Sequence, residues 1–308
     1  GFNLARVSEV GLNIEAGNIP TGPDIASPPR LDYAGTVQLR EMTLEPVPPL
    51  PVSPAALPRP YPTRADEAAA AGAIRTRLQD RLALREGEMA VMVNLAWPMY
   101  AGRYHAYGTS LGLAPWGDHW GFSSNSTNTW LRRDLRYLRE HGIRVVRIFL
   151  FGDLRTGLIY NAQGQPVGFD PLVYRDMAAL LAACREEGLL LVPSLLDFLV
   201  ADGVTREGPG LAWKVGERPE LFLRQDFRAA LVQLLAGFVQ DFDGPEVLMW
   251  ELMNEPENAV AMATPERFRA LRIFLHEMAL ALHQQGVLTT IGARHLGDAQ
   301  RWWRGVAD

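Results

Sequence analysis

The stretch VLMWELMNEPE, residues 247–257, decides how the rest of the chain is interpreted. Its apolar first half is short enough for a buried β-strand. Asparagine and glutamate are poor strand residues and Pro256 cannot donate a ladder hydrogen bond, so we predict that the strand ends at Asn254. The Glu255 carboxylate would then lie at the carboxyl end of the strand, where parallel α/β folds keep their reactive side chains. The alternative is that Asn-Glu-Pro forms an ordinary turn.

Five apolar segments that alternate with helical patterns predict a parallel α/β fold from residue 89 onward. The predicted strands are residues 89–97, 143–151, 189–198, 247–254 and 287–295. The predicted helices are residues 127–141, 171–188 after an Asp170 cap, 227–242, and one that begins at Thr264. Strands this apolar are covered on both faces. Because no unit carries a glycine-rich phosphate loop, the pattern favours a β/α barrel over a dinucleotide-binding sheet.

The number of predicted strands is too small for a closed barrel. An eight-stranded barrel typically needs about 250 residues, whereas 220 residues run from Met89 to Asp308 and five strands are predicted among them. We therefore expect strands six to eight to lie outside this chain. The chain begins at Gly1 without an initiator methionine, so we also expect a truncation or processing event at the front.

The region before the predicted barrel divides into three parts. Residues 1–45 are predicted to form two or three β-strands, because apolar and polar residues alternate around Leu12 and Val37. Residues 46–64 are rich in proline and favour a semi-rigid linker, with a partner-binding proline motif as the alternative. Residues 65–86 predict a helix packed against the bottom of the barrel, so the barrel domain is assigned to residues 65–308.

The bulk composition limits the classes of partner. The chain has 308 residues, of which 48% are hydrophobic and 21% charged, as in ordinary globular proteins. A net charge of −5 argues against nucleic acid or an anionic membrane as a partner. The single cysteine, Cys184, cannot form an internal disulfide and is interpreted as a core residue. No apolar run reaches membrane-spanning length, and because the histidines lack metal-ligand spacing we expect neither metal nor cofactor.

Two segments resemble the cellulase-type glycoside hydrolases, family 5 and its relatives in clan A. The first is VLMWELMNEPE, because the fourth strand of the (β/α)8 barrel in those enzymes ends in Asn-Glu-Pro. The second is DLRYLREHGIRVVRIFLF, residues 134–151, which matches their first helix and second strand and includes Arg147. The resemblance covers residue 88 to the C-terminus. It implies that Glu255 is the general acid/base of a retaining glycosidase, that Asn254 binds a sugar hydroxyl, and that the protein is extracellular.

Residues 1–45 also resemble the closing strands of the β-sandwich carbohydrate-binding modules that often precede such barrels. This likeness is short, and it implies that the front of the module lies outside the chain.

Retaining hydrolysis uses two carboxyl groups about 5–5.5 Å apart. Glu255 suits the proton donor if apolar neighbours such as Trp250 and Met253 favour its neutral form. In related enzymes the nucleophile is a glutamate at the end of the seventh strand, so the resemblance places it beyond Asp308. Arg147 is a lone charge in an apolar strand and needs a partner. The resemblance pairs it with the catalytic carboxylates, and a structural ion pair is the alternative.

Further substrate contacts are predicted at the ends of strands and in the loop after the first strand. Flat aromatic rings suit pyranose faces, and polar side chains at strand ends suit sugar hydroxyls. Many relatives carry a histidine where the third predicted strand ends in aspartate. The predicted substrate-binding residues are Trp97, Trp116, Trp120, Asp197, Trp250 and His295.

Three functions compete for this sequence. The first is a retaining β-glycanase acting on a polymer such as cellulose or mannan. The second is a non-catalytic carbohydrate-binding or assembly protein that keeps the barrel scaffold, and the number of carboxylates in the cleft would separate it from the first. The third, a phosphate-binding barrel enzyme, lacks the glycine-rich loop that it would need. The expected partners are a carbohydrate substrate and the remaining C-terminal segment of the barrel.

Overall fold

A computed structural model describes residues 74–83 except 75, 90–95, 111–112, 119, 121–201 except 153, 155 and 156, 218–299 except 260 and 261, and 303. The predicted β-sandwich strands at 1–45 and the predicted linker at 46–64 lie outside these residues. In the described part of the chain, no helix combines the length and apolar character needed to cross a membrane.

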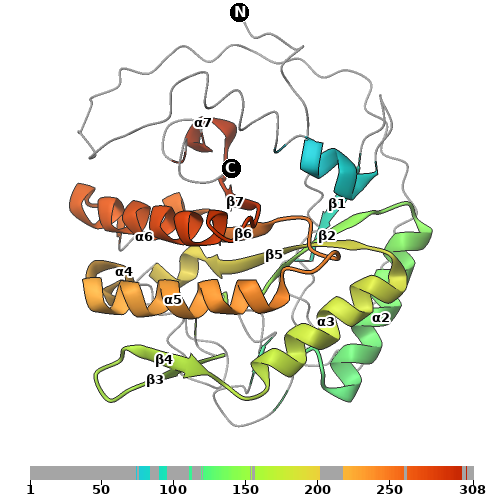
Figure 1. The fold of residues 1–308 in the computed structure, drawn as a ribbon, viewed down its shortest axis with the longest axis horizontal. Helices are drawn as coiled ribbons and strands as arrows, with labels where there is room; N and C mark the ends of the chain where they lie inside the picture. Colours follow the sequence, from blue (N-terminus) through green and yellow to red (C-terminus); the bar gives the residue numbers. More distant parts are fainter. Residues whose placement is uncertain are drawn as a thin grey trace, which may run out of the picture.

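Five parallel strands form one sheet in the order β1-β2-β5-β6-β7 (Figure 1). They are β1 (Met92–Asn94), β2 (Val145–Phe149), β5 (Leu190–Asp197), β6 (Trp250–Asn254) and β7 (Thr289–Gly292). Each strand pairs with the next one along the chain, and a helix lies in each connection, as parallel pairing requires. The five predicted strands are confirmed, although all five are shorter than predicted. The end of β6 at Asn254 is also confirmed.

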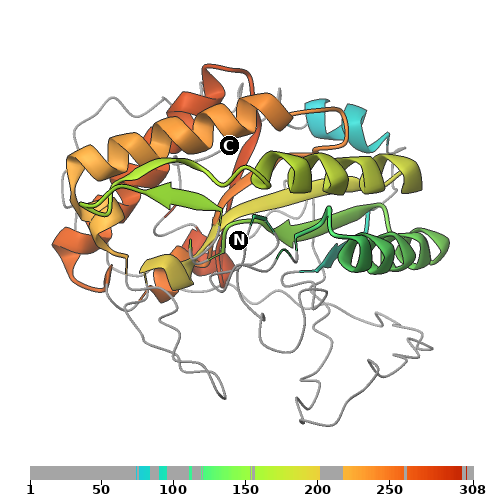
Figure 2. The same cartoon turned by 90° about the horizontal axis from the view of Figure 1, so that it is seen from below.

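Four long helices follow one another along the sheet, which runs beneath α3 and α5 in Figure 2. They are α2 (Asn125–Glu140), α3 (Val173–Glu187), α5 (Gln225–Phe242) and α6 (Pro265–His283). The predicted stop of α3 is confirmed, because Gly188 adopts φ 66° at the helix C-cap. The predicted Thr264 cap of α6 is confirmed too, since its Oγ1 accepts the Arg267 N–H at 3.4 Å. Helix α3 begins at Val173 rather than at Pro171.

An antiparallel hairpin between β2 and α3 was not predicted. It consists of β3 (Leu158–Tyr160) and β4 (Pro166–Phe169). Asn161 closes its turn, because its Oδ1 accepts the N–H groups of Gln163 and Gln165, both at 3.0 Å. Strands this short carry too little alternation for a pattern to be recognised. The remaining short elements are η3 (Phe198–Ala201), α4 (Glu220–Leu223), η4 (Pro256–Asn258) and α7 (Leu296–Asp298).

The main hydrophobic core lies between the sheet and the helices. Trp250 of β6 and Phe238 of α5 are both fully buried there and meet edge to face, with ring centroids 6.2 Å apart. Cys184 of α3 belongs to the same core, which confirms its interpretation as a packing residue. Burial and the charge of Glu246 raise the pKa of the Cys184 thiol to about 12, so the thiol stays protonated.

A helical segment at residues 76–82 covers the amino-terminal ends of the strands. Its Leu82 packs with Val145, Val192 and Leu248, and its Arg81 donates to the Leu248 carbonyl at 3.3 Å. The prediction of a helix against the bottom of the sheet is therefore confirmed for these residues. The opposite, carboxyl-terminal edge of the sheet carries the polar side chains described next.

Candidate active site

The carboxyl ends of the parallel strands bring polar residues from distant parts of the sequence into register. Asn94 pairs with Arg147 between β1 and β2. Asp197 of β5 pairs with Asn254 of β6, and Asn254 in turn pairs with Gly292 of β7. In β-sheets the side chains of paired residues point to the same face. The side chain of Arg147 links the two pairs, because it donates to Oδ1 of Asn94 at 3.1 Å and to Oδ1 of Asn254 at 2.7 Å.

Arg147 and Glu251 form a buried ion pair at the centre of this group. The Glu251 carboxylate accepts from both Nε and Nη2 of Arg147, and the Nη2–Oε1 distance is 2.5 Å. Only 9% of Arg147 and 2% of Glu251 is exposed to solvent. A charge buried in an apolar strand is tolerated because its partner is equally buried and bonded through two atoms.

Gly292 leaves room for this ion pair. A Cβ at position 292 would collide with the Glu251 carboxylate and lie 3.1 Å from Nη2 of Arg147. The neighbouring atom is a charged group already fixed by two hydrogen bonds, so it has little freedom to move aside. The close approach of β7 to the ion pair thus requires glycine at this position.

Gly292→Ala is expected to lower the free energy of unfolding by about 1–3 kcal/mol, the usual cost of forcing a group into a filled site. The measurement is urea unfolding followed by circular dichroism. Gly237→Ala, in the middle of α5 where an added Cβ meets nothing within 4 Å, is the matched control and should be neutral or stabilising. Equal midpoints for wild type and Gly292→Ala would contradict the steric argument.

The side-chain amide of Asn254 is held in one orientation by two neighbours. Its Oδ1 accepts from Nη2 of Arg147 at 2.7 Å, and its Nδ2 donates to Oδ2 of Asp197 at 2.7 Å. Arg147 can only donate, so Oδ1 must face it and Nδ2 must face Asp197; turning the amide over would place the NH2 group against the guanidinium. An NH2 group carries two hydrogens, and Asp197 takes one of them. Among the described residues no acceptor meets the other hydrogen, which could donate to a ligand oxygen.

Asp197 ends β5 and is completely buried. Its second oxygen, Oδ1, accepts the Leu199 N–H at 3.0 Å. Burial raises the pKa of this carboxyl to about 7, and the negative charge of Glu255 adds to the rise. The hydrogen bonds from Leu199 and Asn254 and the charge of Arg147 lower the pKa but do not cancel the effect of burial.

The raised pKa of Asp197 predicts a pH-dependent contribution to stability. Between its ordinary pKa of 3.8 and about 7 the folded chain holds a proton here that the unfolded chain has lost. This contribution to stability is therefore complete below pH 3.8 and is lost as the pH rises to about 7. The loss is at most on the order of 4 kcal/mol, since one pKa unit corresponds to about 1.4 kcal/mol.

Asp197→Asn removes this titration and tests it. The stability of the variant minus that of wild type should rise from about pH 4.5 to about pH 7 and stay level above that, as linkage requires. Urea unfolding at several pH values measures the difference. Asp226→Asn, at an exposed carboxyl whose pKa is lowered by Arg224, should give a flat difference over the same range. A flat difference for Asp197→Asn as well would show that this carboxyl titrates normally.

Glu255 is the first residue after β6 and is half-buried. Its backbone lies in the left-handed region, with φ 44° and ψ 49°, which is uncommon for a residue other than glycine and marks local strain. Two bonds hold it there. The Glu255 N–H donates to the Gly292 carbonyl at 2.5 Å, and its Oε2 accepts from Nδ2 of Asn258 at 2.5 Å. The carboxylate therefore stands at the carboxyl edge of the sheet in a fixed direction.

The structure changes the interpretation of three predicted site residues. Arg147 is hydrogen-bonded to the carboxylate of Glu251, as in the structural ion pair, and it also donates to Asn254 next to Glu255. Trp250 cannot contact a substrate, because it is fully buried against α5 and donates to Asp243 at 3.0 Å. Asp197 is likewise too buried to reach a sugar, and it acts on Asn254 instead.

The remaining predicted contacts are not decided by the geometry. His295 is exposed after β7, where its carbonyl accepts the N–H groups of Asp298 at 3.0 Å and Ala299 at 3.1 Å. The three tryptophans predicted to stack on sugar rings lie outside the described residues: Trp97, Trp116 and Trp120.

The sequence analysis did not single out four residues of the group: Asn94, Glu251, Gly292 and Asn258. A signal existed for Glu251, because a lone arginine in an apolar strand demands a buried acid, and this glutamate is one of two acids in the predicted strands, the other being Asp197 at a strand end. No sequence pattern marks Gly292 or Asn258, whose side chain bonds to Glu255.

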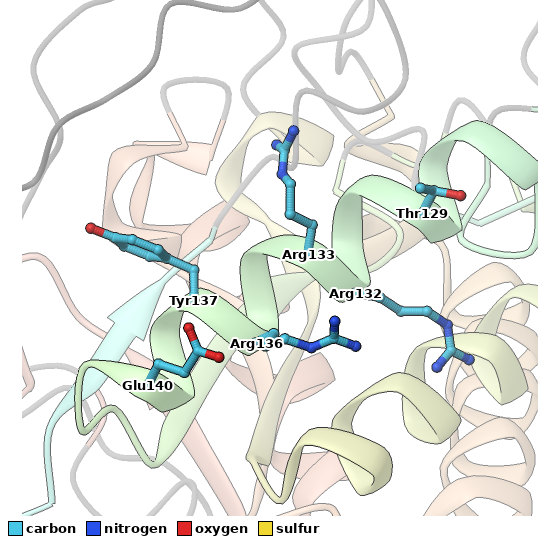
Figure 3. A pocket seen from close by; sticks show the side chains of 6 residues that line it. All are labelled: Thr129, Arg132, Arg133, Arg136, Tyr137 and Glu140. Atoms are coloured by element: carbon cyan, nitrogen blue, oxygen red, sulfur yellow. The ribbon is translucent and has the colours of Figure 1, made fainter.

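A surface hollow elsewhere on the molecule is unrelated to this group. The residues that line it all belong to α2: Thr129, Arg132, Arg133, Arg136, Tyr137 and Glu140. Figure 3 shows their side chains leaving the helix in different directions. Arg132 and Arg136 form ion pairs with Glu186 and Glu187 of α3. The hollow is thus part of a solvated helix surface.

The described fold defines the general class of the protein. A parallel sheet with one helix per connection, and with its polar group at the carboxyl edge, is the arrangement of α/β barrels. Crystal structures support this assignment. The β-1,4-D-mannanase of Cryptopygus antarcticus matches with a TM-score of 0.50 and 14% identity over 66% of this chain and 56% of that chain. The β-1,4-mannanase of the sea hare Aplysia kurodai matches with a TM-score of 0.50 and 18% identity over 68% of this chain and 61% of that chain.

Sequence comparison points to the same group of proteins. Mannan endo-1,4-β-mannosidase 2 of rice, Oryza sativa subsp. japonica, is 32% identical over 130 residues, which are 37% of this chain and 28% of that protein. No family model matches the chain. The chain thus spans less than a third of the curated relative and little more than half of the two solved mannanases. Sequence and fold agree in a likeness to β-mannanases, which are glycoside hydrolases.

Proposed function

We propose that this protein is a retaining glycoside hydrolase that cleaves a β-linked polysaccharide of the mannan type. The observation that supports this most directly is the Asn254–Glu255 pair at the carboxyl edge of the sheet. Asn254 is locked in orientation by Arg147 and Asp197, and Glu255 is held in a strained backbone conformation. Strain and fully determined side-chain orientation are typical of catalytic positions.

In the proposed mechanism Glu255 is the general acid/base. It would give a proton to the glycosidic oxygen as the bond to the anomeric carbon breaks, and a second carboxylate would attack that carbon from the opposite face. None of the described residues is proposed as this attacking carboxylate. In the deglycosylation step Glu255 would take a proton from the incoming water.

Asn254 is proposed to bind the sugar hydroxyl next to the scissile bond through its second amide hydrogen. Arg147 and Asp197 are proposed as positioning residues, because both are buried and each is hydrogen-bonded to Asn254. His295, Trp97, Trp116 and Trp120 remain proposed sugar contacts around this centre.

The proposed substrate class rests on the relatives, whose names specify β-1,4-mannan. Cellulose-type β-glucan is the alternative substrate, because the resemblance to family 5 also includes cellulases. Because such polymers are encountered outside cells, we also propose an extracellular location.

Activity assays with the full-length protein test this proposal. Reducing ends released from soluble β-mannan and from soluble β-glucan would be measured side by side, and the anomer first formed would be followed by NMR. We expect turnover on β-mannan with retention of configuration. Binding of β-mannan without any release of reducing ends would identify a non-catalytic carbohydrate-binding protein, and inversion would contradict the assigned mechanism.

A further inference from the structure

Asn258 makes two hydrogen bonds to Glu255. It is the last residue of η4, the short turn that follows β6. Its side-chain Nδ2 donates to Oε2 of Glu255 at 2.5 Å, and its backbone N–H donates to the Glu255 carbonyl at 2.8 Å. One oxygen of the carboxylate is therefore occupied by a group three residues further along the same turn.

The orientation of the Asn258 amide is set from its other side by Arg294. Nη1 of Arg294 donates to Oδ1 of Asn258 at 3.1 Å. A guanidinium has only donors and a carboxylate has only acceptors, so Oδ1 must face Arg294 and Nδ2 must face Glu255. The three side chains form a relay in which a permanent cation polarises the amide that contacts the carboxylate.

Arg294 is itself fixed to the turn. Its backbone N–H donates to Oε1 of Glu257, and the indole N–H of Trp303 donates to Oε2 of the same glutamate at 3.1 Å. Glu257 thus ties the segment after β7 to η4. Since the Glu255 N–H is also bonded to the Gly292 carbonyl, the backbone on both sides of the relay is held in place.

We propose that Asn258 is a positioning residue for Glu255, which it holds through Oε2 so that Oε1 carries the transferable proton. This inference rests on the proposed function, because it assigns the oxygen that acts in the general acid step. As the proton leaves Oε1, the electron pair of the breaking C–O bond moves to the glycosidic oxygen. The negative charge that appears on Glu255 then strengthens the bond from Asn258, since hydrogen bonds to ionised acceptors are the stronger ones.

Asn258→Asp tests this assignment. Aspartate has the same shape and suits the end of a short turn, but when ionised it has no hydrogen to donate. We expect kcat on β-mannan to fall roughly 10–100-fold, the effect of losing a hydrogen bond to a charged group, with KM unchanged. An activated aryl β-mannoside needs little protonation and should lose several-fold less. Asn258→Ala should show the same contrast between substrates.

The matched control is Asn161→Asp, which adds the same charge in the hairpin turn. Its Oδ1 accepts two backbone N–H groups, and the substitution keeps both bonds while it removes the 3.2 Å bond from Nδ2 to Oε1 of Gln165, far from the site. We expect the wild-type ratio of the two activities. If Asn258→Asp keeps the wild-type ratio of the two activities, whether or not both have fallen, the positioning role is refuted while the proposed function stands.

A measurement without turnover tests the contact itself. In ¹⁵N-labelled protein the Asn258 side-chain resonances are assigned by their disappearance in Asn258→Asp. They should shift in Glu255→Ala, and unchanged resonances would overturn the pairing. If wild type instead cleaves no β-linked substrate although the resonances shift, the proposed function fails and the assignment of the proton to Oε1 fails with it.

Discussion

Replacing Glu255 with glutamine is expected to lower kcat on β-mannan by roughly 10²–10⁴-fold, the range over which general acid catalysis acts. Glutamine keeps the shape of the side chain but cannot give up a proton. Substrate affinity should change little, because Asn254 and its two partners are untouched. The measurement is initial-rate kinetics on β-mannan, with affinity for mannooligosaccharides determined separately by calorimetry.

The leaving group makes this test specific to proton donation. With an activated aryl β-mannoside the departing oxygen needs little protonation, so the glycosylation step should be lowered far less than with the polymer. Glu266→Gln, at an exposed position in the first turn of α6, is the control and should match wild type on both substrates. Equal losses of Glu255→Gln on polymer and aryl substrate would exclude it as the general acid.

The strands and their ends were predictable because they depend on local composition. Five runs of buried apolar residues, each followed by a helical pattern, leave parallel pairing as the one arrangement that covers both faces. The position of Glu255 follows from the proline after it, which forbids further ladder bonds. These features need no knowledge of which residues meet in space.

The direction of each side chain was less predictable. Trp250 lies in a strand that is apolar on both faces, and in such a strand alternation does not reveal which face is the barrel interior. The partner of Arg147 is 104 residues away in the sequence, and it is brought close only by the register of β2, β5 and β6. Asp197 was recognised as a strand-end carboxylate, but the burial that raises its pKa comes from the fold.

The second large effect is expected at the ion pair beneath the site. Arg147→Met should lower the free energy of unfolding by about 3–5 kcal/mol, because Glu251 would stay buried without a partner. Asn254 would lose its bond to Nη2 in the same variant. Urea unfolding at neutral pH measures this. Asp226→Asn is the control, because it weakens the exposed pair with Arg224 and leaves that guanidinium over the Phe227 ring, so the free energy of unfolding should change far less than in Arg147→Met.

A double variant separates two contributions to the loss of stability: the unpaired charge of Glu251 and the lost packing of the Arg147 side chain. In Arg147→Met with Glu251→Leu neither member of the pair is left as a buried charge without its partner, and apolar side chains fill a similar volume, so most of the stability should return. The double variant should nevertheless remain poor on β-mannan, because Arg147 no longer holds the Asn254 amide in orientation. Recovery of activity together with stability would show that Asp197 alone orients Asn254. A double variant as unstable as Arg147→Met would mean that the site depends on the shape of the arginine rather than on the neutralisation of Glu251.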